Sequence, residues 1–277
     1  MTLRAPAKLN LCLYLGRPRA DGLHELRSLF CPLTLSDRIV VRDAGRDEVV
    51  CPQVGRPNLV EAALAGLRAR GWNRGPTRVE IEKRIPVAAG LGGGSADAAA
   101  LLRLARDEVA LGDLAAELGA DVPSQLEPTL ALVGGAGEVV EPLPAPRQFG
   151  VVLVPGDAAL STAEVYAEAD RLGLVREPEE LDSLAAKLRE AAGNGDSPLA
   201  YRELLVNDLA EAALSLRPEI AEALKALRDA GAGVALVTGS GPTAFGIFED
   251  VAAADAAAGA LAPRFAGAIV AGPDPER

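Results

Sequence analysis

Residues 86–100 read PVAAGLGGGSADAAA, a glycine-rich stretch that separates two contrasting patterns. Residues 77–85 before it include Val79 and Ile81 and are typical of a strand, and the alanine- and leucine-rich residues 95–106 after it predict a helix. Four glycines in five residues allow a backbone to approach a partner closely. Ser95 follows them where a helix N-cap is expected.

A glycine loop that leads into a helix presents free backbone N–H groups and the positive end of the helix dipole, which together favour phosphate. A flexible surface turn is the alternative. The sequence lacks the GxxxxGK[ST] pattern of P-loops, and the glycine spacing does not match the dinucleotide fingerprint. We therefore predict a phosphate-binding loop of another kind.

The amino-acid composition and net charge exclude several classes of function. The 277 residues can bury a large core, and 49% apolar with 24% charged residues is ordinary for a globular protein. A formal net charge of −11 argues against nucleic-acid binding and requires any phosphate site to be a local one. His24 is the only histidine, which excludes a histidine-rich metal site.

Three scattered cysteines without a CxxC pair are typical of reduced thiols in a cytoplasmic protein. Because apolar runs stay short and Lys8 and Asn10 interrupt the first of them, we expect neither a membrane span nor a signal peptide.

The patterning predicts an α+β fold, because strands and helices mix without regular alternation. Residues 8–15 alternate with period two, which places Lys8 and Asn10 on one strand face. The prolines at 142, 144 and 146 suggest a domain junction. Among the other predicted elements are extended runs at 25–35 and 37–42, helices at 58–70, 161–172, 179–192, 201–214, 218–229 and 251–261, and strands at 129–134, 138–141, 150–155, 234–237, 244–248 and 266–270.

Three further segments carry candidate polar residues: PAKLNL (6–11), GADVP (119–123) and VTGSGPT (237–243). Each has an ordinary structural interpretation when taken alone. A lysine on an apolar strand is typical of a strand edge, an aspartate before proline of a turn, and a second glycine loop of a hairpin.

The four segments in this order resemble the superfamily of galactokinase, homoserine kinase, mevalonate kinase and phosphomevalonate kinase, the GHMP kinases. The resemblance runs from residue 6 to residue 246, and DGLHEL (21–26), STAEVY (161–166) and NDL (207–209) add to it. It implies a two-domain GHMP kinase fold. Residues 1–145 would form an N-terminal domain like ribosomal protein S5 domain 2, with a left-handed βαβ crossover, and residues 146–277 a ferredoxin-like C-terminal domain.

The resemblance also implies a reaction and its residues. The branch it favours phosphorylates the C2 hydroxyl of 4-diphosphocytidyl-2-C-methyl-D-erythritol with ATP and Mg²⁺, in non-mevalonate isoprenoid biosynthesis. Lys8 and Asp121 would be the catalytic pair, with Asp121 accepting the hydroxyl proton. Ser95 is a possible Mg²⁺ ligand. The implied ATP-binding residues are Asn58, Pro86, Val87, Ala88, Ala89, Gly90, Leu91, Gly92, Gly93, Gly94, Ser95 and Ala96, and the implied substrate-binding residues are Asn10, His24 and Tyr166, with His24 facing the cytosine.

The chain departs from the family pattern at three places. Leu23 replaces an aromatic residue before the histidine, Ala96 replaces the second serine of GGGSSD, and Ser124-Gln125 replaces a pair of phenylalanines. Weaker stacking on cytosine is expected from the first departure and a lost hydroxyl from the second.

Two other functions remain open: a GHMP kinase for another small alcohol, of the homoserine or mevalonate type, and a non-catalytic homologue that only binds nucleotide or ligand. The expected partners are small molecules, without nucleic acid or membrane, and the chain would be a monomer or a homodimer.

Overall fold

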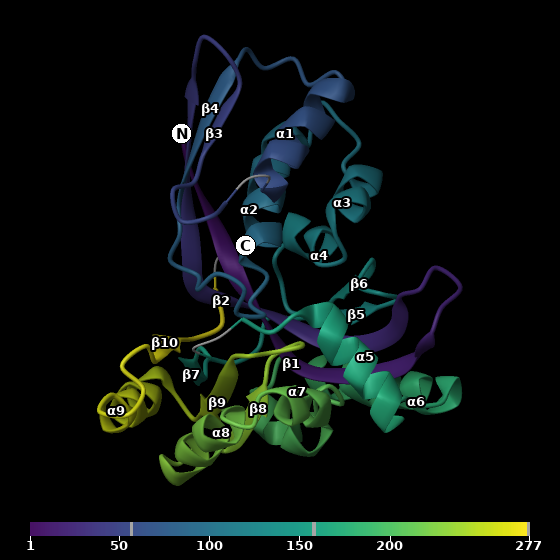
Figure 1. The fold of residues 1–277 in the computed structure, drawn as a ribbon, viewed down its shortest axis with the longest axis vertical. Helices are drawn as coiled ribbons and strands as arrows, with labels where there is room; N and C mark the ends of the chain where they lie inside the picture. The colour runs from purple at the N-terminus through teal and green to yellow at the C-terminus, as the bar shows by residue number, and fades with distance from the viewer. Residues whose placement is uncertain (56–57, 157–158, 276–277) are drawn as a thin grey trace.

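The computed structural model describes residues 1–55, 58–156 and 159–275. Two sheets organise them (Figure 1). The first has six strands in the order β3-β4-β2-β5-β6, with β1 paired to β2, and the second has the order β10-β7-β9-β8. The strands of the first sheet are β1 Thr2–Pro18, β2 His24–Asp43, β3 Glu48–Val50, β4 Thr77–Glu82, β5 Ala131–Gly134 and β6 Val139–Pro142.

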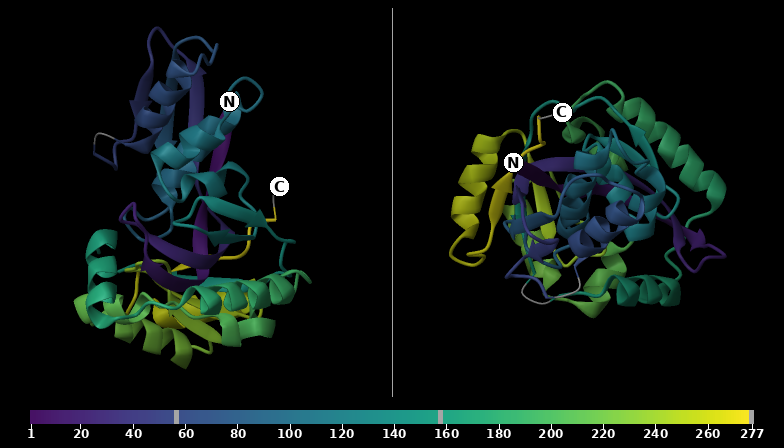
Figure 2. Two further views of the ribbon diagram at one scale, coloured as in Figure 1. Left: turned by 90° about the vertical axis from the view of Figure 1, so that its right-hand side faces the viewer. Right: turned by 90° about the horizontal axis from the view of Figure 1, so that it is seen from above.

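The helices beside the first sheet lie on one side of it (Figures 1 and 2). They are α1 Leu59–Ala69, α2 Gly93–Leu102, the 3₁₀ turn η1 Arg103–Ala105, α3 Gly112–Leu118 and α4 Val122–Leu126. The strands β3 and β4 pair in parallel and α1 lies between them in the chain, so these elements form a βαβ unit. The other pairings of this sheet are antiparallel.

The second sheet is antiparallel and its elements follow the order βαββαβ, with several helices in the first crossover. This arrangement is ferredoxin-like, as predicted. Its elements are β7 Gly150–Val154, α5 Thr162–Leu172, α6 Pro178–Ala192, η2 Pro198–Leu204, α7 Ala210–Leu216, α8 Ile220–Asp229, β8 Val234–Val237, β9 Ala244–Phe248, α9 Val251–Leu261 and β10 Ile269–Ala271.

One hydrophobic core joins the two sheets. Buried leucines of β1 and β2, among them Leu9 and Leu29, pack in the same cluster as Leu153 and Phe245 of the second sheet. A separate cluster fills the space between α1, α2 and the first sheet. Strand β1 pairs with β2 and packs its leucines into the shared cluster. Because such close-packed side chains leave a strand little freedom, Lys8 and Asn10 are held on a rigid element.

Three expectations about the elements were wrong. The runs at 25–35 and 37–42 form one strand, β2. The helix predicted over 201–214 is interrupted, because η2 ends at Leu204 and α7 begins at Ala210. Asn207, in the interruption, donates to two backbone carbonyls of another loop. The segment after Asp121 is the short helix α4 and not only a turn.

None of the helices in the described part of the chain is long and apolar enough to cross a membrane.

Candidate active site

The glycine loop winds through left-handed backbone conformations before α2 begins. Gly90 has a φ of 74° and Gly92 a φ of 66°, values that residues with a Cβ rarely adopt, and Ala88 also has a positive φ of 57°. The helix begins at Gly93, with Gly92 as its N-cap. The expectation that Ser95 is the N-cap was therefore wrong, because the glycines allow the helix to start earlier, and Ser95 lies in the first turn.

Two glycines of this loop have no room for a side chain. A Cβ at Gly90 would lie 2.8 Å from the carbonyl oxygen of Gly241 and 2.9 Å from that of Thr238. A Cβ at Gly92 would lie 2.7 Å from Cγ of Lys8. The loop thus packs against the second glycine loop on one side and against a lysine of β1 on the other.

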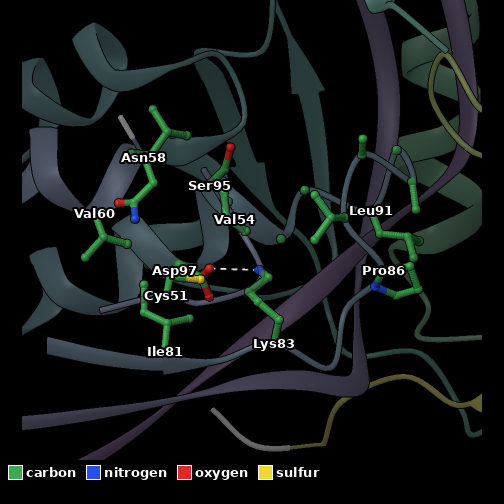
Figure 3. A pocket seen from close by; sticks show the side chains of 18 residues that line it. Cys51, Val54, Asn58, Val60, Ile81, Lys83, Pro86, Leu91, Ser95 and Asp97 are labelled. Carbon is green, nitrogen blue, oxygen red and sulfur yellow. Dashed lines mark hydrogen bonds and ion pairs between the residues drawn. The ribbon is translucent and has the colours of Figure 1, made fainter. Parts of the chain in front are cut away.

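The loop forms one wall of a cavity of about 410 Å³ (Figure 3). The opposite wall is largely apolar and includes Val54, Val60 and Ile81. Asn58 also lines the cavity and caps α1, because its Oδ1 accepts from the Glu61 N–H at 3.0 Å. All loop residues from Pro86 to Ser95 line the cavity. A free helix N-terminus beside an apolar slot suits a nucleotide with its phosphates on the loop.

Ala96 differs from the other residues implied to bind ATP. It does not line the cavity, and its fully buried methyl group belongs to the hydrophobic cluster under the first sheet. Because side chains turn by about 100° per residue along a helix, the residue after Ser95 faces the core. The hydroxyl that is absent at Ala96 would therefore lie in the core of the structure, away from the cavity.

A buried charge cluster that the sequence analysis did not identify lies at the edge of the same cavity. Lys83 Nζ donates to Asp37 and, at 2.8 Å, to Asp97 Oδ2 (Figure 3). Asp37 also accepts from the backbone N–H groups of Arg84 and Ile85, so the cluster anchors the start of the glycine loop. Burial raises the pKa of Asp97 to about 7, against the opposing effect of Lys83.

Lys8 lies at the inner edge of the glycine loop and reaches a carboxylate from α4. Its Nζ is 3.3 Å from Oδ2 of Asp121, and its backbone N–H donates to the Leu91 carbonyl at 3.0 Å. The ammonium also lies 4.5 Å from the centre of the Phe30 ring. The side chain of Lys8 is 8% exposed and that of Asp121 is 31% exposed, so only the carboxylate is open to a ligand.

Asn10 holds Lys8 in place. Its Oδ1 accepts from Lys8 Nζ at 2.6 Å, as the shared strand face predicted, and its Nδ2 donates to Ser28 Oγ at 3.0 Å. Its backbone N–H donates to Thr238 Oγ1 of the second glycine loop at 3.0 Å. Register shifts on both sides of this segment, between Pro6 and Lys8 and between Asn10 and Cys12, are irregularities of the kind that redirect side chains.

The second glycine loop, residues 238–243, is held by the segment between η2 and α7, which contains Asn207. Asn207 Nδ2 donates to the carbonyls of Val237 and Gly239, at 2.7 and 2.8 Å. The peptide bond between Gly241 and Pro242 is cis. The four segments of the sequence analysis therefore meet at one place: the loop of residues 86–92 packs between Lys8 and residues 238–241, and Lys8 pairs with Asp121.

His24, Tyr166 and Asp170 form a contact group of their own. The ring centres of His24 and Tyr166 lie 5.0 Å apart, and His24 Nε2 is 2.8 Å from Asp170 Oδ1. Burial and the negative charge of Asp121 raise the pKa of Tyr166 to about 12. Leu23, next to His24, is 52% exposed.

Comparison with known proteins agrees with this geometry. Models of the GHMP kinases N terminal domain and of GHMP kinases C terminal match residues 58–127 and 180–267. The 4-diphosphocytidyl-2-C-methyl-D-erythritol kinase of Anaeromyxobacter dehalogenans is 40% identical, over 95% of this chain and 85% of the relative. That of Nocardia farcinica is 42% identical, over 94% and 89%. The chain belongs to the 4-diphosphocytidyl-2-C-methyl-D-erythritol kinase family of GHMP kinases.

Solved structures place the fold in the same family. A crystal structure of 4-(cytidine 5'-diphospho)-2C-methyl-D-erythritol kinase has a TM-score of 0.81 at 37% identity, with 98% of each chain covered. The homoserine kinase of Cytophaga hutchinsonii has a TM-score of 0.70 at 18% identity, over 99% of this chain and 94% of that chain, which shows a shared fold only. The α+β two-domain GHMP kinase fold is thereby confirmed, and ATP is the phosphate donor of these kinases.

Proposed function

We propose that this chain transfers the γ-phosphoryl group of ATP to the C2 hydroxyl of 4-diphosphocytidyl-2-C-methyl-D-erythritol, giving the 2-phosphate in non-mevalonate isoprenoid biosynthesis. The observation that carries the proposal is the Lys8–Asp121 pair, 3.3 Å apart at the inner edge of a loop suited to phosphate. The activity for which relatives at about 40% identity are named supports the choice of substrate.

ATP lies, in this proposal, with its phosphates on the loop and its adenine against the apolar wall of the cavity. The free N–H groups of the first turn of α2, from Gly93 to Ser95, face the phosphates together with the positive end of the helix dipole. Asn58 stands at the adenine side, with its Oδ1 already used by the helix cap.

Asp121 accepts the proton of the C2 hydroxyl as the bond from that oxygen to the γ-phosphorus of ATP forms and the bond from the γ-phosphorus to the β,γ-bridging oxygen breaks, which releases ADP. Lys8 stabilises the negative charge of this carboxylate and of the phosphoryl group in transfer. Because Asn10 and the ring of Phe30 hold the ammonium from its other sides, its position is set before substrate arrives. The protein acts mainly through positioning and electrostatics, as is general for phosphoryl transfer.

Mg²⁺ fits the residues present. The described residues contain no group of three or more acidic, histidine or cysteine side chains that could hold a metal. Mg²⁺ in kinases is, however, held by one or two protein oxygens together with substrate phosphates. The Ser95 hydroxyl, on the first turn of α2 in the cavity wall, is the oxygen that would hold it. Bound there, the ion would neutralise charge on the phosphates.

The acceptor side of the site is the group formed by His24 and Tyr166. The substrate of these relatives is a cytidine diphosphate derivative, and buried His24 with half-buried Tyr166 offers its base a stacking surface with a hydrogen-bonding edge. Asn10, 2% exposed and fully bonded within the protein, acts in this proposal by holding Lys8 near the substrate.

The proposal includes a domain boundary between residues 145 and 146, and a cytoplasmic monomer or homodimer. The proline-spaced residues 142–146 lie between β6 and β7, at the change from one sheet to the other. Cys12, Cys31 and Cys51 are free thiols, which suits a reducing compartment.

Assays of phosphoryl transfer with three acceptors test the proposal. ADP formation is measured with 4-diphosphocytidyl-2-C-methyl-D-erythritol, homoserine and mevalonate in parallel. We expect turnover of the first alone. Turnover of homoserine or mevalonate without the cytidine substrate would establish the rival kinase, and nucleotide binding without turnover of any of them would establish the non-catalytic homologue.

A further inference from the structure

The group around His24 contains a carboxylate to which the proposed function gives no role. Asp170 lies on α5, one turn after Tyr166, and its Oδ1 is 2.8 Å from His24 Nε2. The imidazole is nearly enclosed, with 7% of its side chain exposed, whereas the carboxylate is 43% exposed. The Asp170 carboxylate is therefore partly exposed to solvent while one of its oxygens contacts His24.

A carboxylate can only accept, so the contact defines the proton on the imidazole. Nε2 must carry a hydrogen in order to donate to Asp170. In a neutral imidazole the other nitrogen, Nδ1, then holds a lone pair. Within the described part of the chain the structure gives Nδ1 no hydrogen-bond partner, and the ring lies against Tyr166 in the acceptor half of the site.

We infer that Asp170 is a positioning residue that fixes the Nε2–H tautomer of His24, so that Nδ1 accepts from the exocyclic amine of cytosine and discriminates against uracil. Cytosine carries a donor amine where uracil carries a carbonyl acceptor. A lone pair at Nδ1 attracts the first and repels the second. The inference rests on the proposed function and adds to it the means by which the base is recognised.

The contact with Asp170 is the interaction that sets this tautomer. The contact joins residues far apart in the sequence, from the start of β2 and from α5. Tyr166 and Asp170 are four residues apart on one helix, so they present to His24 a ring and a carboxylate from the same helix face.

The single histidine makes the inference directly measurable. In protein labelled with ¹⁵N-histidine, one imidazole gives the whole signal, and its two nitrogens report the tautomer without assignment. We expect the wild-type protein at neutral pH to show a protonated Nε2 and an unprotonated Nδ1. Cytidine diphosphate should shift the Nδ1 resonance as it accepts a hydrogen bond. A protonated Nδ1 in the wild-type protein would overturn the inference without any variant.

Replacement of Asp170 by alanine is the second arm. Asp170→Ala should give a mixture of tautomers and reduce the preference for cytidine diphosphate over uridine diphosphate by about tenfold. The affinity for ADP should remain unchanged, because the donor site is elsewhere. Glu164→Gln, which removes an exposed charge from the same helix, is the matched control and should leave both the tautomer and the preference as in the wild type.

The outcomes separate the inference from the proposed function. A preference for cytidine diphosphate that survives Asp170→Ala, or is equally lost in Glu164→Gln, would overturn the inference while the kinase proposal stands. A wild-type protein that binds neither cytidine diphosphate nor its alcohol substrate would overturn the proposed function itself.

Discussion

At the residue scale, the buried lysine of β1 is stable only because of its partners. Burying an ammonium without partners is costly, yet Lys8 has an amide oxygen, a carboxylate and an aromatic face around it. Asn10 supplies the amide oxygen and is itself bonded to Ser28 and Thr238. Asp121, the proposed catalytic base, therefore faces an ammonium group held by three partners.

A substitution at Leu23 tests whether this residue lies against the cytosine of the substrate. Replacing Leu23 by tyrosine should lower the apparent KM for the cytidine substrate about fivefold, because an added aromatic face contributes about 1 kcal/mol of stacking. The KM for ATP should not change. Steady-state kinetics measure both values, with Leu23→Met as the control of similar size without a ring.

An unchanged KM in Leu23→Tyr, together with a loss of affinity in His24→Ala, would show that another group fills that face of the base.

The candidate residues could be identified from the sequence, but not all of the contacts between them could be predicted. Lys8 and Asn10 could be placed on one face from the period of two, and the geometry confirmed it. Asp37, Lys83 and Asp97 are separated by 46 and 14 residues, and nothing in their local patterns indicates that they meet. Only the approximate position of Asp97 in the first turns of the predicted helix could have suggested a role beside the loop.

At the element scale, the glycine loop depends on backbone conformations and close contacts. Gly92→Ala should destabilise the protein by at least about 1–2 kcal/mol, the cost of a left-handed residue with a Cβ. The Cβ would also displace Lys8, from whose Cγ it would lie 2.7 Å. Urea unfolding measures the first effect and kcat the second.

Gly94→Ala is the matched control for unfolding. A Cβ there would lie 3.7 Å from Leu59 Cδ1, an ordinary contact, in a helical position. Equal loss of stability in the two variants would contradict the role given to the left-handed conformation of Gly92.

The cluster that joins β2, β4 and α2 should make stability depend on pH. The pKa of Asp97 is raised to about 7 in the folded protein, where burial outweighs Lys83 and Asp37 adds repulsion. The folded state therefore binds more protons than the unfolded state between about pH 4 and pH 7. Stability from this group is present below pH 4 and is lost as pH rises through 7.

Asp97→Asn removes this dependence. The variant should gain stability relative to the wild type as pH is raised from 5 to 8, since its amide does not titrate. Urea denaturation of both proteins at the two pH values measures the difference. A constant difference across this range would contradict the raised pKa. Asp37, Lys83 and Cys51, the other titratable groups that interact with Asp97, are present in both proteins.

The predicted elements failed where tertiary contacts decide the backbone. The helix expected over 201–214 has suitable side chains but is interrupted, because Asn207 bonds to the second glycine loop. Ser95 has the chemistry of an N-cap, but three adjacent glycines allow α2 to begin before it. Helix α9 and the β5–β6 pair, whose side-chain patterns are undisturbed by the site, agree with prediction.

At the scale of the whole molecule, the site exists because two sheets share a core under β1 (Figure 1). The first sheet supplies Lys8 and the glycine loop, α4 supplies Asp121, and the second sheet with its helices supplies residues 238–243 and Tyr166. In the proposed reaction the donor side is the glycine loop, whereas the acceptor side combines His24 of β2 with Tyr166 of α5. Lys8 contacts the glycine loop and pairs with Asp121.

The most direct test compares phosphoryl transfer by the wild type and Asp121→Asn. Each protein is mixed with ATP, Mg²⁺ and 4-diphosphocytidyl-2-C-methyl-D-erythritol, and formation of the 2-phosphate is followed, with the ADP affinity of each measured in parallel. We predict that the asparagine variant binds ADP as the wild type does and loses about 10²–10⁴-fold in kcat. Unchanged turnover in Asp121→Asn would contradict the account, because the proton of the hydroxyl would then leave by another route.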